Sequence, residues 1–129
     1  MNARMGTLFR TILKAAGVLA GLWLALAAYI HTKPVVVIHY SAAATQPVSC
    51  FYNGNNYIRR EYIHPGDIRT FRTSHDPGPD YFVDVSLPMD GDHVELSPPF
   101  SRVDVYLGAD RKITRTVTRM DFLARFGFD

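Results

Sequence analysis

The pattern of apolar and polar positions changes near residue 33 of the chain. Residues 15–30 contain no charged or strongly polar side chain, and an apolar run of this length favours a helix. After Pro34 the chain consists of short stretches rich in Val, Ile, Tyr, Phe and Thr, separated by turn-forming residues. Such punctuation is typical of strands. The sequence therefore predicts an N-terminal segment over 1–33 and a β domain over 34–129.

The apolar segment has a length close to the thickness of a membrane. A helix over residues 15–30 would span about 24 Å, and a helix over 8–30 about 34 Å, against a hydrocarbon core of about 30 Å. Arg4, Arg10 and Lys14 precede or begin this segment, and basic residues stay on the cytoplasmic side. We therefore expect one transmembrane helix in membrane lipid, with the N-terminus cytoplasmic and the domain on the other side.

Two short patterns leave the fate of this segment open. Ala25 and Ala27 form an A-x-A cleavage pattern, and cleavage would release a secreted or periplasmic protein that starts at Ala28. Gly17, Gly21 and Ala25 recur every four residues, which predicts a smooth strip where another membrane helix can approach. We favour an uncleaved signal-anchor, because such a strip has no use in a discarded peptide.

The β domain is expected to contain seven or eight strands. Residues 81–87 and 102–107 alternate between apolar and polar side chains, as half-buried strands do. Residues 34–40 form a continuous apolar strand. Residues 57–63 form the weakest strand, because a run of charges interrupts the alternation and indicates a bulge or an exposed edge. Residues 113–119 place three threonines on one face, which indicates an edge or a solvated face.

The C-terminus shows the only helical spacing of the domain. Residues 118–121 resemble a capping box with Asp in place of Glu. Phe122, Leu123 and Phe126 follow at helix spacing, and Gly127 stands at the expected end. We therefore predict a short C-terminal helix or turn whose aromatic side chains cover an open end of the sheet.

One stretch carries a resemblance to a known fold. Residues 62–71, with the sequence YIHPGDIRTF, resemble the strand–PG[DE]–strand hairpin of immunoglobulin-like extracytoplasmic domains. The resemblance implies an all-β, immunoglobulin-like sandwich of antiparallel strands. The overall plan also resembles short bacterial envelope proteins that have one N-terminal helix and a small β domain, which implies a bacterial inner membrane and a periplasmic domain. Fold alone implies no function.

The charge of the chain separates into two regions. The net charge is +2, with 14 basic and 12 acidic residues. Four of the basic residues precede Pro34, whereas all 12 acidic residues follow it, so residues 34–129 carry 10 − 12 = −2. Nucleic-acid binding needs a basic face that displaces counterions from phosphates. We therefore expect no nucleic-acid partner.

Motifs for catalysis are missing from the sequence. There is no GxSxG motif and no Gly-rich phosphate loop. Ser74, His75 and Asp76 are adjacent, but successive side chains of a strand face opposite ways, so adjacency does not make a triad. We therefore expect a non-enzymatic protein without a cofactor or a small-molecule substrate.

The histidines and the single cysteine were considered as ligands of a metal site. The five histidines show no HxxxH or HExxH spacing. A copper site needs soft ligands, for which the candidates are Cys50, Met89, His93 and His64. The single cysteine, Cys50, is better interpreted as a buried small hydrophobic residue. We therefore predict no metal site.

One region has the composition of a binding surface. Residues 50–62 place aromatic and arginine side chains around an Asn-Gly turn, and interfaces favour these residue types. The alternative is an ordinary hairpin in which some tyrosines are buried. The candidate interface, on the helix and on the domain, comprises Gly17, Gly21, Ala25, Phe51, Tyr52, Tyr57, Arg59, Arg60 and Tyr62.

Three functions remain open. The first is a single-pass membrane protein that serves as an accessory or assembly subunit of a larger membrane complex. It is supported by the strip of small residues and by the short step of four residues from Ile30 to the first strand at Pro34, which reaches at most about 14 Å. The second is a secreted or periplasmic binding protein of the inhibitor or immunity type. The third is a metal carrier.

Overall fold

A computed structural model describes residues 2–55, 57–74, 78–88 and 91–128 of the chain. The chain forms two compact units, Met1–Thr32 and Lys33–Asp129.

The first unit is a single helix, α1, over Asn2–His31. Within it, the 26 residues of Gly6–His31 are long and apolar enough to cross a membrane, and 0% of the most apolar window is buried. At 1.5 Å per residue this stretch measures about 39 Å, more than a hydrocarbon core of about 30 Å. The helix begins earlier than the apolar run, because Arg10 and Lys14 are good helix formers. The predicted N-terminal apolar helix is confirmed.

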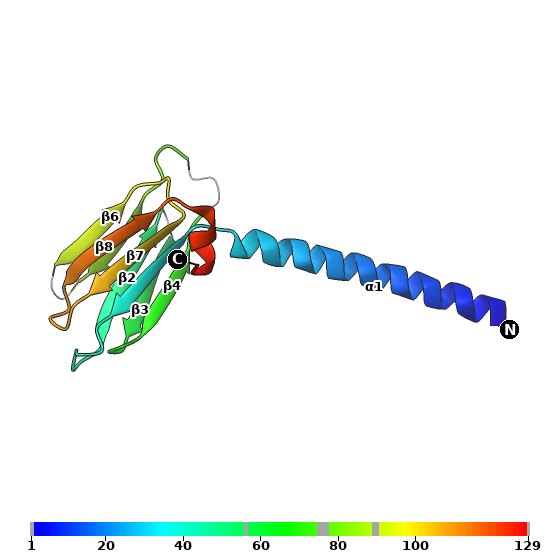
Figure 1. The fold of residues 1–129 in the computed structure, drawn as a ribbon, viewed down its shortest axis with the longest axis horizontal. Coiled ribbons are helices and arrows are strands. Elements are labelled where there is room, and N and C mark those ends of the chain that lie inside the picture. Colours follow the sequence, from blue (N-terminus) through cyan, green and yellow to red (C-terminus); the bar gives the residue numbers. More distant parts are fainter. Residues whose placement is uncertain (1, 56, 75–77, 89–90, 129) are drawn as a thin grey trace. The chain divides into compact units, whose positions relative to one another are not determined.

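The second unit consists of two four-stranded sheets (Figure 1). Sheet A has the order β4-β1-β7-β8 and sheet B the order β3-β2-β5-β6. The strands of sheet A, in that order, are Ile68–Arg72, Val35–Tyr40, Arg102–Leu107 and Ile113–Arg119. Those of sheet B are Tyr57–Ile63, Val48–Gly54, Val83–Leu87 and Asp92–Leu96. The eight strands confirm the predicted number and a sandwich-like, mostly β architecture.

The core lies between the two sheets and is built by strand alternation. Strands β2 and β5 alternate strictly between buried and half-buried residues. Strand β1 is buried on both faces over most of its length, which explains its continuous apolar sequence. The largest fully buried apolar side chains are Ile38, Ile63, Leu87, Val35, Val36, Val83, Val85, Val103 and Val105.

The prediction that all strands are antiparallel is wrong for one pair. Strands β1 and β7 are parallel, with Val35 opposite Arg102 and Tyr40 opposite Leu107. Alternation shows which face a residue occupies but not the direction of its strand. Parallel neighbours need a long crossover connection, and here the whole of sheet B lies between β1 and β7 in the sequence.

The segment 62–71 is not a hairpin. Strand β3 belongs to sheet B and β4 to sheet A, so the Pro-Gly-Asp turn carries the chain from one sheet to the other. The turn is closed by a hydrogen bond from the Asp67 amide to the His64 carbonyl (3.0 Å), and Gly66 has φ +83°, which glycine adopts readily. Strands β3 and β8 both lie at sheet edges, as their sequences indicated.

A C-terminal 3₁₀ helix, η1, covers Phe122–Phe126. Its N-cap is Asp121, whose carboxylate accepts a hydrogen bond from the Ala124 amide (3.2 Å). The capping box predicted over 118–121 is therefore wrong, since Thr118 belongs to β8. The predicted end at Gly127 is confirmed, because this residue adopts a left-handed φ of 82°.

The aromatic side chains of η1 do not cover the sheet. Phe122 is 50% exposed and Phe126 43% exposed, whereas Ala124 is buried. The predicted aromatic cover is therefore wrong. The tight turn of a 3₁₀ helix places side chains three residues apart on one face, and here the small residue of the turn faces inward.

Candidate functional site

Strand alternation divides the candidate interface of residues 50–62 over two faces. Strands β2 and β3 are antiparallel, with Phe51 opposite Arg60 and Tyr52 opposite Arg59. Tyr52 belongs to the core, so Tyr52 and Arg59 point to the core side of sheet B, and Phe51 and Arg60 to its outer face. The one surface predicted from the sequence is thus two separate surfaces.

On the outer face, Arg60 is held between two aromatic rings. Its guanidinium carbon lies 5.7 Å from the ring centre of Phe51 and 4.9 Å from that of Tyr62. It also donates hydrogen bonds to the Ser49 hydroxyl (3.0 Å) and the Tyr62 hydroxyl (2.5 Å). Tyr62 is 56% exposed. We call Phe51, Arg60 and Tyr62 the Arg60 cluster. Because its arginine is fixed by its neighbours, less side-chain entropy is lost on binding.

An open hollow lies next to the Arg60 cluster on the same face. Ile58 at its rim is 65% exposed. The Oδ1 atom of Asn53 is buried and has no hydrogen-bond partner among the described residues. A buried unpaired acceptor is costly, so this oxygen favours an incoming donor. The hollow is lined by Phe51, Asn53, Ile58, Asp84, Ser86 and Pro88.

The remaining predicted interface residues of the domain lie at the open side between the edge strands β3 and β4. Tyr52 is a core residue that stacks on Phe71 with ring centres 4.5 Å apart. Arg59 lies over the same Phe71 ring (5.8 Å) and pairs with Glu61 (2.6 Å). Tyr57 lines a groove with Tyr52 and Arg59. The alternative that some tyrosines of the hairpin are buried therefore holds for Tyr52.

Gly54 makes room for the Tyr52 ring at the end of β2. A Cβ atom at this position would lie 3.2 Å from a ring carbon of Tyr52, which is closer than ordinary van der Waals contact. The turn predicted at Asn53 and Gly54 is therefore wrong, since both residues belong to β2 and pair with β3, and Gly54 serves the packing of the core.

On α1, the predicted small-residue strip is open. Cβ atoms added at Gly17 or Gly21 would meet nothing within 4 Å, and Ala25 is exposed. The helix surface at these positions is therefore available to a neighbouring helix.

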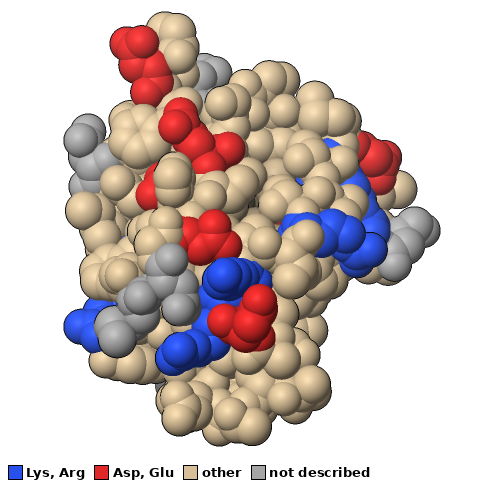
Figure 2. All heavy atoms as spheres, turned by 90° about the vertical axis from the view of Figure 1, so that its left-hand side faces the viewer, with Lys and Arg blue, Asp and Glu red and all other residues tan. Residues whose placement is uncertain are grey.

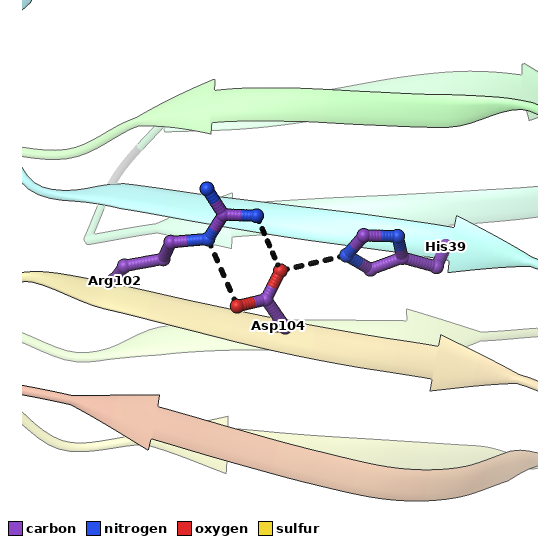
Figure 3. Close-up of polar contacts among 3 residues, drawn as sticks. All are labelled: His39, Arg102 and Asp104. Carbon is purple, nitrogen blue, oxygen red and sulfur yellow. Dashed lines mark hydrogen bonds and ion pairs between the residues drawn. The ribbon is translucent and has the colours of Figure 1, made fainter. Parts of the chain in front are cut away.

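A buried polar cluster that the sequence did not reveal lies on the outer face of sheet A (Figure 3). Asp104 is 1% exposed and accepts two hydrogen bonds from Arg102, at 2.9 and 2.8 Å. Nε2 of His39 lies 2.6 Å from Oδ1 of Asp104. His39 in turn stacks on the ring of Tyr106. The guanidinium carbon of Arg115 lies 4.3 Å from the centre of the same Tyr106 ring.

Charge pairing determines the ionisation of Asp104. Burial alone would raise its pKa, but the hydrogen bonds from Arg102 and His39 and their charges outweigh burial and hold the pKa below its usual value of 3.8. Both carboxylate oxygens are engaged, so the arrangement is suited to an ion pair that fastens β1 to β7. The Arg-x-Asp spacing was visible in the sequence, but the parallel pairing that brings His39 to it was not.

Two of the residues considered for copper, Cys50 and His93, lie on opposite faces of sheet B. Cys50 is fully buried, as the sequence predicted, and burial, with the charges of Glu61 and Asp84, raises its pKa to about 12. Its thiol faces the core, whereas His93 lies on the outer face beside Ser86. Among the described residues no group of three His, Cys, Asp or Glu side chains could hold a metal ion.

Three of the residues considered for chemistry lie outside the described ranges. They are Met89, a candidate copper ligand, and His75 and Asp76 of the adjacent Ser-His-Asp residues.

The face of the domain drawn in Figure 2 carries charges of both signs. Acidic and basic side chains occur together on it, in places side by side. No protein-family model, no curated protein and no solved structure matches this chain.

Proposed function

We propose that this protein is a single-pass membrane protein that serves as an accessory or assembly subunit of a larger membrane complex. In this proposal α1 anchors the chain in a bacterial inner membrane, and the outer face of sheet B binds a partner protein. The observation that carries the proposal is the Arg60 cluster, an arginine held between the half-buried ring of Phe51 and the exposed ring of Tyr62 on an open sheet face.

The chemistry of this face favours a protein partner. Tyr and Arg dominate the binding energy of protein interfaces, especially where they form rigid anchors. The hollow beside the cluster offers an exposed apolar residue, Ile58, together with the unpaired Asn53 acceptor and the Asp84 carboxylate. A partner could place an apolar side chain against Ile58 and a backbone or side-chain donor at the Asn53 acceptor.

The helix supports a membrane setting for this partner. The strip of Gly17, Gly21 and Ala25 is open, and small residues let membrane helices pack closely. Arg10 and Lys14 near the start of the helix favour a cytoplasmic N-terminus, which would place the domain in the periplasm. The proposal includes an immunoglobulin-like relationship for the sandwich, supported by its two packed four-stranded sheets.

A second candidate is a secreted or periplasmic binding protein of the inhibitor or immunity type. It rests on the A-x-A pattern at Ala25 and Ala27, and it would use the same outer face. Sequencing of the mature N-terminus separates the two candidates, because a start at Ala28 supports the secreted form and an intact N-terminus supports the anchor.

The test is recovery of the partner from membranes of the source organism. The tagged full chain is crosslinked, solubilised in mild detergent and purified, as wild type, Arg60→Ala and Arg115→Ala. Arg115 also lies over a tyrosine ring but on sheet A, so its variant is a matched control. We expect Arg60→Ala to lower partner recovery about tenfold or more, and Arg115→Ala to leave it unchanged. Equal recovery with both variants, or no partner with wild type, would contradict the proposal.

A further inference from the structure

The C-terminal residues expose a group of large apolar side chains. Each of them is between 43% and 66% exposed, and contiguous exposed apolar patches mark binding surfaces for proteins or membranes. We call these residues the C-terminal patch. The patch consists of Met120, Phe122, Leu123, Phe126 and Phe128.

The fold holds the patch facing outward. Asp121 caps η1 at its start, Gly127 ends it in a left-handed conformation, and Ala124 is the residue that is buried. Phe122 and Phe126 contact each other edge to face at 5.7 Å. The apolar side chains are thus presented on a capped turn whose inward position is already occupied.

The patch lies at the end of the sandwich where the chain enters it. The carbonyl of Arg119 accepts a hydrogen bond from the Ser101 amide (2.9 Å), and the Ser101 carbonyl accepts one from the Val35 amide (3.0 Å). Arg125 donates to the Ser101 hydroxyl (3.3 Å) and lines a small hollow together with Pro34. Figure 1 shows η1, in red, beside the start of β1.

The connection to α1 is short. The helix ends at His31, and the Thr32 amide still donates to the Ala28 carbonyl (3.0 Å). Three Cα–Cα steps from His31 to Pro34 reach at most about 11 Å. The headgroup region on each side of a bilayer is roughly 5–8 Å thick. A domain on such a tether would keep its Pro34 end within about 11 Å of the end of α1, at or just beyond the lipid headgroups.

We propose that the C-terminal patch inserts into the interfacial region of the bilayer that holds α1. This inference rests on the membrane anchoring in the proposed function. Segments that lie in the interface combine Phe or Leu side chains with Lys and Arg. Basic residues at the same end of the domain suit anionic lipid phosphates. They include Lys33, Arg72, Arg119 and Arg125.

Two attachments would orient the domain. A helix alone leaves the domain free to swing on its tether, whereas a second contact at the same end would fix which face is directed away from the lipid. The Arg60 cluster would then keep one orientation toward its partner, which lowers the entropy cost of binding.

The experiment uses the full chain with one tryptophan as a depth probe. The only natural tryptophan, Trp23, is replaced by Phe, and the probe is introduced as Phe122→Trp. The matched control is Ile68→Trp, since Ile68 is 58% exposed and pairs with His39, four residues along β1 from Val35 and about 13 Å further from the entry end. A second variant, Phe126→Trp, guards against a local effect at one position.

The proteins are reconstituted into vesicles of phosphatidylethanolamine and phosphatidylglycerol, with and without bromine on the acyl chains. We expect tryptophan at 122 and at 126 to show blue-shifted emission and about twofold or stronger quenching by brominated lipid than tryptophan at 68. Flotation of the same vesicles reports the anchoring separately.

Each outcome has a defined meaning. Equal quenching at 122, 126 and 68 in protein that floats with the vesicles would overturn the inference and leave the anchoring intact. Protein that does not float would overturn both. A blue shift that occurs in native membranes but not in pure lipid would overturn the lipid contact and indicate a protein partner for the patch.

Discussion

Asp104 shows how one residue combines burial with charge. Its carboxylate is almost fully buried on the outer face of a sheet and is paired with Arg102 on its own strand and His39 on the neighbouring strand. A buried charge that loses its partner is strongly destabilising. The cluster therefore ties the two parallel strands together, and its contribution depends on the ionised carboxylate.

Replacing Asp104 by Asn should destabilise the domain. The change leaves Arg102 and His39 partly buried without their counter-charge, and we expect the free energy of unfolding to fall by about 2–3 kcal/mol. Urea unfolding of the full chain in detergent, followed by the near-ultraviolet circular dichroism of the tyrosines, measures it. Asp67→Asn is the control, because its pair with Arg69 is much more exposed and is worth about 1 kcal/mol or less. Equal effects of the two changes would contradict this role of Asp104.

The same carboxylate predicts a dependence on pH. Its pKa in the folded protein lies below 3.8, so the unfolded chain takes up a proton first as the pH falls. The stabilisation is therefore complete above roughly pH 5 and is lost as the pH drops through 3.8 toward the folded pKa. We expect the stability difference between wild type and Asp104→Asn to be constant above that range and to shrink below it. A difference that stays unchanged in acid would contradict this sign.

The helices and strands that depend on contacts between residues close in the sequence could be predicted from local patterns. The apolar helix, the eight strands and the two edges β3 and β8 follow from runs and alternation in the sequence. The parallel pairing of β1 with β7 and the corner at 62–71 do not, because they depend on contacts between distant segments. Half of the predicted interface of residues 50–62 lies on one outer face. Strand alternation assigns Phe51, Arg60 and Tyr62 to this face and Tyr52 to the core.

The helix strip carries its own prediction. Gly17→Leu combined with Gly21→Leu fills the open strip and should weaken close packing with another membrane helix, while leaving insertion intact because leucine is apolar. We expect crosslinking of α1 to its partner within membranes to fall several-fold. The control is Val18→Leu with Leu22→Val, which exchanges two exposed apolar residues outside the strip. Equal crosslinking in both variants would mean that the strip makes no contact.

In the whole molecule, the two regions of the chain carry net charges of opposite sign. The net charge of +2 is the sum of a basic N-terminal segment and a domain with a net charge of −2. In the proposed function, the apolar helix, whose most apolar window has no buried share, anchors the chain, and the Arg60 cluster of the domain binds a partner. The C-terminal patch adds a second contact with the same membrane in this account.

In the proposed function the anchored chain belongs to a larger complex, and blue-native electrophoresis of gently solubilised membranes measures this. We expect the 14.5 kDa chain to migrate with a much larger assembly, and Arg60→Ala to shift it toward the free form. Migration only as a small monomer, with wild type and Arg60→Ala alike, would contradict the proposed function.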